Sequence, residues 1–254
     1  PQSVSGKILA VADKLNTLTG IFSLGKNPTG NKDPFGLRRA ALGIIRVLIE
    51  GNLELDIKKA INDSMDQQPY SKIDGTLPTE LLFDFIMDRS KTYFRETRPN
   101  FRSDIFDAVR ACQPTSLLDF QARLMAVENF TTLPEAPRLA AATKRTVNIL
   151  RKSEYSDYGN EVDKNLFDNQ SEIELYENLQ AAQKDIEPSI QQRAYSDALV
   201  RLASLQVSID RFFDSVLVMA EDKDIRANRL ALISQLSAIF RRVADISILT
   251  DIKG

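Results

Sequence analysis

Residues 224–248 read DIRANRLALISQLSAIFRRVADISI, and the spacing of apolar residues in this stretch decides the fold class. Large apolar side chains recur every three or four positions, at Leu230, Ile233, Leu236, Ile239 and Val243. That period places them on one face of an α-helix, whereas a half-buried strand would alternate with period two. The stretch therefore predicts a long amphipathic helix from Asp224 to about Ile248.

The same helical period runs through the rest of the chain. We predict helices over residues 7–22, 35–50, 53–65, 78–95, 103–111, 116–130, 139–152, 171–184 and 188–220. Asp33 followed by Pro34 is typical of a helix N-cap and the first helical residue, and Gly51 is suited to end that helix. Because no segment alternates as a strand does, the predicted class is all-α, with two packed helical domains, the second a helical bundle.

Two prolines indicate where these domains divide. Pro134 and Pro137 interrupt the helical pattern between Phe130 and Leu139, and proline cannot continue a helix interior. We therefore predict one domain over residues 1–132 and a second over residues 133–254. The turn-rich segment 153–165 is expected to form a loop of the second domain.

The composition restricts the chemistry that this chain can perform. It contains no histidine and one cysteine, Cys112. This excludes a Ser-His-Asp triad, a Cys-His pair, and any histidine-ligated or multi-thiolate metal site within the chain. The segment from Gly20 to Asn27 falls short of a phosphate-binding loop, because Asn27 stands where a Ser or Thr would reach magnesium. We expect no catalytic residue, no metal site and no cofactor here.

The same composition bears on location. No apolar run reaches the roughly eighteen residues that a membrane span needs, so no membrane segment is expected. A single cysteine excludes an internal disulfide and fits a reducing compartment, which predicts a cytoplasmic protein.

Basic and acidic residues are segregated along the chain, although the formal net charge is only −2. Residues 136–153 contain five basic residues and no acidic one, and residues 225–244 contain four arginines and no acidic one. Residues 154–189 contain ten acidic residues and two lysines. Such segregation indicates local charged patches, the alternative being ordinary solvated helix faces.

A first block of sequence resembles a known family. It consists of Val11–Leu18 (VADKLNTL), Gly20–Phe22, Pro28–Gly30, Lys32–Phe35 and Leu37–Ala41. This block resembles the HD-related region of the bacterial glycyl-tRNA synthetase β subunit. Within it, Ala12-Asp13-Lys14-Leu15 resembles the last motif of HD-domain phosphohydrolases. The histidines of that enzyme class are absent, so a degenerate HD phosphohydrolase is the weakest of the alternative functions.

A second block resembles another part of the same subunit. It consists of Lys144-Arg145, Asn148–Leu150, Tyr195–Leu199, Phe212–Val216, Val218–Asp222 and Arg226–Leu230. This block is similar to the C-terminal anticodon-binding domain of the β subunit, a helical domain related to one in arginyl-tRNA synthetases. The resemblance therefore extends over nearly the whole chain.

The resemblance implies a function and partners. It implies a heterotetramer of two α and two β subunits, in which the α subunit holds ATP and glycine while the β subunit grips glycine tRNA. For this chain it implies a tRNA-binding, non-catalytic role, so the chain alone is expected neither to activate glycine nor to charge tRNA. The main alternative is a helical scaffold that docks the α subunit without touching RNA.

The two basic stretches and the resemblance together predict the tRNA-binding residues. These are Lys144, Arg145, Arg226, Arg229, Arg241 and Arg242. Arg226 and Arg229 are three residues apart, so they share a helix face near free backbone amides that favour phosphate. We expect these two to form one patch with Lys144 and Arg145, with a smaller contribution from Arg241 and Arg242. Base stacking is assigned to arginine or to Tyr195, whereas Phe212 and Phe213 are expected in the core.

Overall fold

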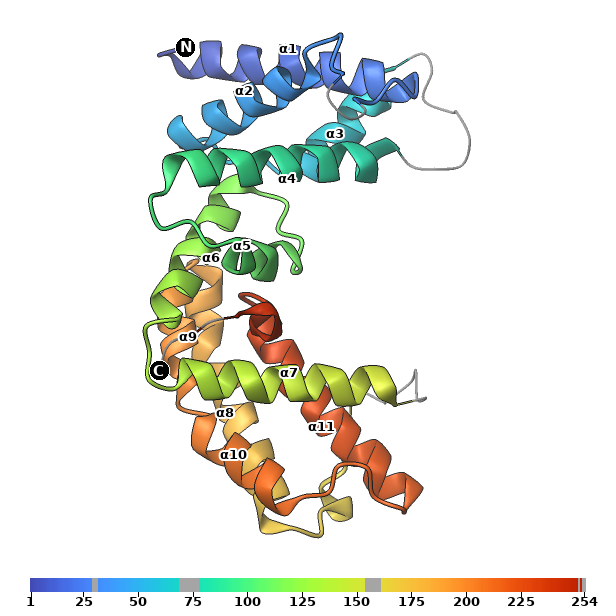
Figure 1. The fold of residues 1–254 in the computed structure, drawn as a ribbon, viewed down its shortest axis with the longest axis vertical. Coiled ribbons are helices and arrows are strands. Elements are labelled where there is room, and N and C mark those ends of the chain that lie inside the picture. The colour runs from blue at the N-terminus through green and yellow to red at the C-terminus, as the bar shows by residue number, and fades with distance from the viewer. Residues whose placement is uncertain (29–31, 69–77, 154–160, 251, 253–254) are drawn as a thin grey trace. The chain divides into compact units, whose positions relative to one another are not determined.

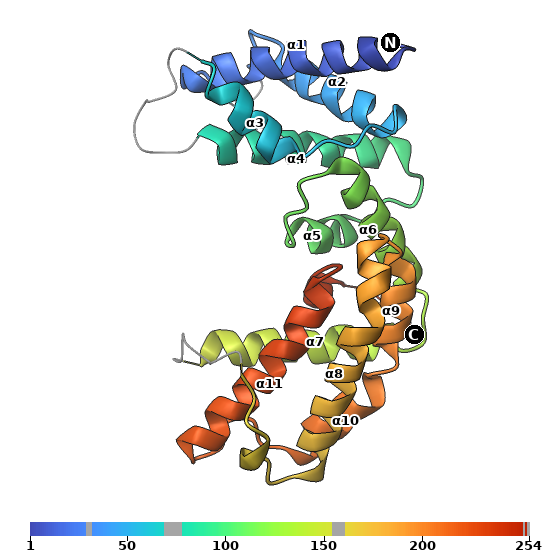
Figure 2. The ribbon, with the colours of Figure 1, turned by 180° about the vertical axis from the view of Figure 1, so that it is seen from behind.

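The computed structural model describes residues 1–28, 32–68, 78–153, 161–250 and 252, and within them the chain is helical without a β-strand (Figures 1 and 2). The all-α prediction is confirmed. The helices are α1 (Val4–Ser23), α2 (Leu37–Glu50), α3 (Ile57–Met65), α4 (Pro78–Thr97), α5 (Ser103–Arg110), α6 (Leu117–Phe130), α7 (Ala136–Lys152), α8 (Gln170–Gln191), α9 (Tyr195–Ala203), α10 (Gln206–Ser215) and α11 (Lys223–Arg241), with short 3₁₀ helices η1 (Lys164–Leu166) and η2 (Ile246–Ile248). Much of the predicted loop 153–165 lies outside the described residues.

The chain forms two compact units, residues 1–103 with 114–121 and residues 104–113 with 122–254. This division differs from a single cut after residue 132, because the C-terminal part of α6 belongs to the second unit. There Arg123 donates hydrogen bonds to the carbonyls of Arg242 and Val243, at 2.7 and 2.9 Å, and Asn129 donates to Ser196 at 3.3 Å. Two independent domains divided at 132/133 remain a prediction.

In the first unit, α1 packs on α2, α3 and α4, and α4 also packs on α2 and α3. The core contains the apolar stripes of these helices: Leu18, Leu37, Ile44, Ile45, Ile61, Leu82 and Ile86. Asp33 does cap α2, but from further away than predicted. The helix begins at Leu37, after Gly36 in a left-handed conformation (φ 67°), and the Asp33 carboxylate accepts the N–H groups of Leu37 and Arg38 at 2.8 and 3.0 Å.

In the second unit, α8 packs against α9, α10 and α11, while α7 packs against α10, α11 and η2. Figures 1 and 2 show α11 crossing α7. Leucine, isoleucine and phenylalanine fill this core, notably Leu175, Leu179, Ile186, Leu199, Leu202, Ile209, Leu230, Ile233, Leu236 and Phe240. Phe212 and Phe213 are buried, so their assignment to the core is confirmed.

The predicted helix 188–220 is wrong. Pro188 lies inside α8, which continues to Gln191, and the following residues form two short helices, α9 and α10. The break is a Schellman motif: the N–H of Ala194 bonds the carbonyl of Ser189 at 2.8 Å, and the N–H of Arg193 bonds that of Ile190 at 3.1 Å. Arg193 takes the left-handed conformation (φ 56°) that glycine usually occupies, so the sequence carries no glycine to mark the end.

The predicted helix 224–248 is wrong at its C-terminal end. Helix α11 ends at Arg241, and the chain turns so that the N–H of Asp245 bonds the carbonyl of Ala108 at 2.9 Å. Asp245 then accepts the N–H of Ser247 at 3.2 Å and starts η2. The helix was predicted too long because Val243 and Ile246 are both buried in the same core, so apolar residues keep a helix-like spacing through this turn.

Candidate nucleic-acid interface

Helix α7 presents a row of exposed cations. Its buried face, which includes Leu139, Ala140, Thr143 and Thr146, sets the opposite face toward solvent. That face carries Arg138, Lys144, Arg145, Arg151 and Lys152, all exposed. Because residues 136–153 contain no acid, any acidic partner for this row comes from another segment.

Two side chains of this row are anchored on α10. The Arg145 guanidinium lies over the ring of Phe213, 4.5 Å from its centroid, and Arg138 lies 3.5 Å from the carboxylate of Asp210. A shallow hollow of ≈ 390 Å³ runs along α7, lined by Ala141, Lys144, Arg145, Asn148, Ile149 and Lys152. An apolar floor between cations suits a flat ring whose attached phosphate is negatively charged.

Arg229 is engaged inside the protein. It is 7% exposed, and its guanidinium donates to the fully buried carboxylate of Glu172 at 2.9 Å, to Asp168, and to the carbonyl of Leu217 at 3.1 Å. Burial lowers the pKa of Arg229, but the hydrogen bonds and charge of Glu172 and Asp168 outweigh it and raise the pKa. This guanidinium can reach a phosphate only by leaving its ion pair.

Arg226 acts as a clamp on the loop before α11. Its guanidinium donates to the carbonyls of Ala220 and Glu221 at 2.7 and 3.3 Å. Two of the amides expected to be free at this helix start are also occupied. The helix begins at Lys223, and the Asp222 carboxylate accepts the N–H groups of Asp224 and Ile225 at 2.9 and 3.0 Å. A phosphate site at this N-terminus therefore stays a prediction, and the structure leaves it fewer free amides than expected.

The predicted patch combined Lys144 and Arg145 with Arg226 and Arg229, and in the structure these two pairs contact different elements. Arg145 faces α10, whereas Arg226 and Arg229 face the loop before α11 and the start of α8. Tyr195 is also unavailable for stacking on a base. It is 3% exposed, and its hydroxyl accepts a hydrogen bond from Arg123 at 3.0 Å.

Arg241 and Arg242 lie at the other end of α11. Arg241 pairs with Asp245 and donates to the carbonyl of Ala111 at 3.1 Å. Arg242 donates to Glu187 on α8 at 2.6 Å, and this bond, with one from Gln191, lowers the pKa of Glu187. The tRNA-binding role of all six cations stays a prediction. Among them Lys144, Arg145 and Arg241 are exposed, Arg226 and Arg242 are half-buried, and Arg229 is buried.

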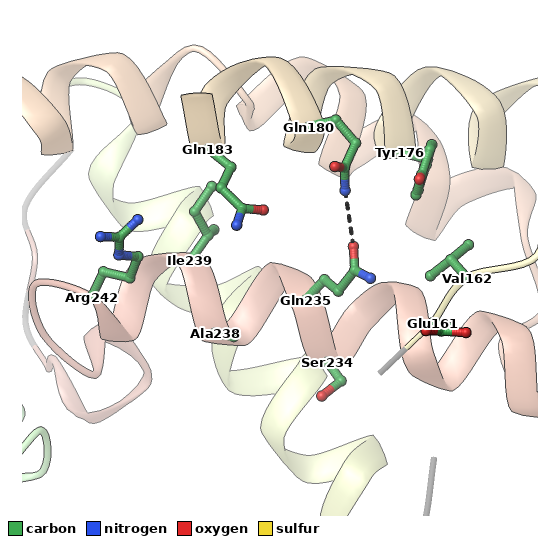
Figure 3. Close-up of a pocket in the computed structure, with 10 residues that line it drawn as sticks. All are labelled: Glu161, Val162, Tyr176, Gln180, Gln183, Ser234, Gln235, Ala238, Ile239 and Arg242. Atoms are coloured by element: carbon green, nitrogen blue, oxygen red, sulfur yellow. Dashed lines mark hydrogen bonds between the residues drawn. The ribbon is translucent and has the colours of Figure 1, made fainter. Parts of the chain in front are cut away.

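A larger depression, the α8–α11 groove, lies between two parallel helices (Figure 3). Its volume is ≈ 700 Å³, and its lining is Glu161, Val162, Tyr176, Gln180, Gln183, Ser234, Gln235, Ala238, Ile239 and Arg242. Gln180 donates a hydrogen bond across the groove to Gln235 at 3.3 Å. Figure 3 shows Tyr176 toward one end of the groove and Arg242 at the other.

Sequence reasoning missed the glutamines of this groove. Gln180 and Gln235 are neutral and 55 residues apart, so neither charge pattern nor spacing brings them together. One sequence pattern could have indicated the groove: both amphipathic helices carry polar residues beside their apolar stripes. The register, however, follows from the ion pair of Arg229 with Glu172, which only the structure reveals.

The HD-related block contributes no cluster of metal-ligating side chains within the described residues, and its Asp13 is exposed on α1. Outside this block, Cys112 is half-buried, and burial raises the pKa of its thiol. Within the described ranges, no three Asp, Glu or Cys side chains are grouped so as to hold a metal ion. Nor does any helix in those ranges have the length and apolar character needed to cross a membrane.

Comparison with known proteins gives two family matches. Residues 1–111 match the family described as glycyl-tRNA synthetase beta subunit, and residues 139–247 match the DALR anticodon binding domain. The second match contains α8, α9, α10, α11 and most of α7. It therefore includes the α8–α11 groove and the whole cation row except Arg138.

Individual relatives agree with these matches. The glycine–tRNA ligase beta subunits of Pseudomonas entomophila and Ectopseudomonas mendocina are each 44% identical over 249 residues, and that of Stutzerimonas stutzeri is 45% identical. These alignments cover 98% of this chain but 36% of each relative, so the chain spans about a third of their length. The chain belongs to the glycyl-tRNA synthetase β subunit family, of which it matches one part.

Proposed function

We propose that this chain is a tRNA-binding, non-catalytic part of a glycine–tRNA ligase β subunit. In this proposal it supports the attachment of glycine to glycine tRNA by a cytoplasmic α2β2 enzyme. The α subunit of that enzyme supplies the site for ATP and glycine, and this chain needs no cofactor of its own.

One observation carries the proposal: Lys144, Arg145, Arg151 and Lys152, four of the five exposed cations of α7, lie within the residues that match an anticodon-binding domain. Lysine and arginine on one exposed face neutralise RNA phosphates and release counterions. Lys144, Arg145, Arg151 and Lys152 can all reach an RNA backbone without breaking an internal ion pair within the described residues. Arg226 and Arg229 contribute by holding the neighbouring segments in place.

The proposal is tested by titrating the chain with labelled glycine tRNA and a non-cognate tRNA at about 50 and about 200 mM salt. Four phosphate contacts give a log–log salt slope of about −3 to −4, so affinity should fall about 10²-fold across this range. Glycine tRNA should bind more tightly than the non-cognate tRNA at both concentrations. Equal and salt-independent binding of the two would contradict the proposal.

A second candidate function, docking of the α subunit by a helical scaffold, is favoured by one observation. Val4, Ile8 and Leu9 on α1 are 59%, 58% and 70% exposed, an unusual concentration of apolar side chains in the open. A chain that captures purified α subunit but shows no tRNA binding at about 50 mM salt would support this candidate over the leading one.

A further inference from the structure

We propose that the α1–α2 basic face, formed by Lys14, Arg39 and Arg46, binds the sugar–phosphate backbone of tRNA. This face lies in the first unit and outside residues 139–247, which match the anticodon-binding domain. The inference rests on the proposed function, because it assumes that the chain binds tRNA. It adds a second RNA contact, one that holds the backbone and carries no sequence information.

Charge is distributed unevenly along the first unit. Residues 14–49, which contain the second half of α1 and nearly all of α2, include six basic residues and one acid, Asp33. That carboxylate already caps α2, because it accepts the N–H groups of Leu37 and Arg38. Residues 50–96, by contrast, include ten acidic and six basic residues. The positive charge of the unit is therefore concentrated on α1 and α2.

Two glycines of α2 let lysines of α1 lie against it. The Lys7 ammonium donates a hydrogen bond to the carbonyl of Gly51, the C-cap of α2, at 3.3 Å, and the aliphatic chain of Lys14 crosses Gly43. A methyl group on Gly43 would lie 2.7 Å from Cε and 3.0 Å from Cδ of Lys14, too close for a normal contact. The absence of a side chain at Gly43 therefore makes room for Lys14 beside α2.

The three cations follow one another along α2. Arg39 and Arg46 are both exposed and seven residues apart, so they share a helix face and lie about 10 Å apart along the axis. Lys14 crosses α2 at Gly43, between the levels of the two arginines. The steps along the axis are thus about 4.5–6 Å, which lets the three side chains reach neighbouring phosphates of one RNA strand.

The charge of this face is not neutralised by nearby acids. In the part of the chain that the structure describes, none of its three cations forms an ion pair. Asp13 is exposed on α1, but one helical step turns it about 100° away from Lys14. Glu50, one turn after Arg46, lies beside Tyr93, whose pKa is raised by burial and then by this carboxylate. The cations therefore remain available to a phosphate.

The side chains of this face favour RNA over a protein partner. The centre of a protein interface usually holds large apolar or aromatic side chains. All residues of α2 are described, and none of its exposed side chains is a large apolar one. The exposed Val4, Ile8 and Leu9 lie at the N-terminal end of α1 instead. Accessible cations without an apolar centre are what an RNA backbone requires.

The test compares tRNA binding by the 254-residue chain and its Arg39→Ala/Arg46→Ala variant. Labelled glycine tRNA and a non-cognate tRNA are titrated at several salt concentrations. Loss of two phosphate contacts should weaken both tRNAs about tenfold at about 50 mM salt and make the salt slope shallower by about two units. The preference for glycine tRNA should not change, because phosphates carry no sequence information.

Lys58→Ala/Lys59→Ala is the matched control, because it removes the same two charges from α3. These lysines already pair with Glu80 and Asp63. The control should change affinity less than threefold, since paired and distant surface charges contribute little. Circular dichroism melting checks that each variant is folded.

Three outcomes would contradict the inference. If the wild type binds tRNA but Arg39→Ala/Arg46→Ala binds it like the control, the basic face does not contact RNA, and the proposed function stands. If this variant keeps tRNA binding but loses capture of purified α subunit, the face docks protein and not RNA. If the wild type binds no tRNA at all, the proposed function itself fails, and this inference with it.

Discussion

We expect Arg229→Ala to lower the free energy of unfolding by about 3–5 kcal/mol, the usual effect of removing one partner of a buried ion pair. The carboxylate of Glu172 is fully buried and would lose its guanidinium partner. It would keep only the backbone N–H groups of Asp168 and Asn169, at 3.3 and 3.1 Å, in the capping box of α8. The fall in stability should appear as a lower midpoint of urea unfolding.

Arg211→Ala is the matched control. Arg211, on α10, pairs at 2.7 Å with Glu174 on α8, the helix that also carries Glu172, but the Arg211 side chain is 61% exposed. An exposed pair contributes about 0–1 kcal/mol. Equal effects of the two substitutions would show that the pair of Arg229 with Glu172 is not buried in solution. In folded Arg229→Ala, an unchanged salt slope of tRNA binding would assign Arg229 to structure rather than to phosphate contact.

The second large effect is expected from Lys144→Ala/Arg145→Ala. Each side chain is exposed on α7, and a hydrogen bond to a charged group contributes about 1.5–3 kcal/mol. Loss of both should weaken glycine tRNA about 10²-fold at low salt and make the salt slope shallower by about two units. Fluorescence anisotropy titration at several salt concentrations measures both quantities.

The matched control is Lys184→Ala/Arg201→Ala, which removes the same two charges from another face. Lys184 is exposed in the acidic stretch of α8, and Arg201 is already paired with Asp185 at 2.8 Å. This control should change affinity less than threefold, because distant surface charges are screened by salt. If both double variants weaken binding equally, net charge and not the α7 row accounts for the affinity.

Much of the fold follows from local pattern. The period of three to four residues gave the helical class and most helix positions, since each amphipathic stripe must be buried whatever its partner is. The acid-free stretch 136–153 likewise indicated a local basic patch, and the structure places its five cations on the exposed side of α7, whose buried face includes Leu139 and Thr143.

The predictions that were wrong, and the features that were missed, depend on contacts between residues distant in sequence or on an unusual backbone conformation. The end of α8 is formed by Arg193 in a conformation that favours glycine, so residue type gave no warning. Arg226 and Arg229 lie in the same acid-free stretch of sequence, so their neighbours do not distinguish them. Arg229 is nevertheless buried in an ion pair with Glu172, which lies 57 residues away in the sequence. The α8–α11 groove depends on the same register and is invisible to a search for charged or metal-ligating residues.

The most direct test of the central claim is a nuclease footprint of this chain on end-labelled glycine tRNA. If residues 139–247 act as an anticodon-binding domain, the chain should protect the anticodon loop and the adjoining stem from cleavage. Lys144→Ala/Arg145→Ala should lose that protection at the same protein concentration. Protection confined to the acceptor stem, or no protection at concentrations where the chain binds tRNA, would contradict the account.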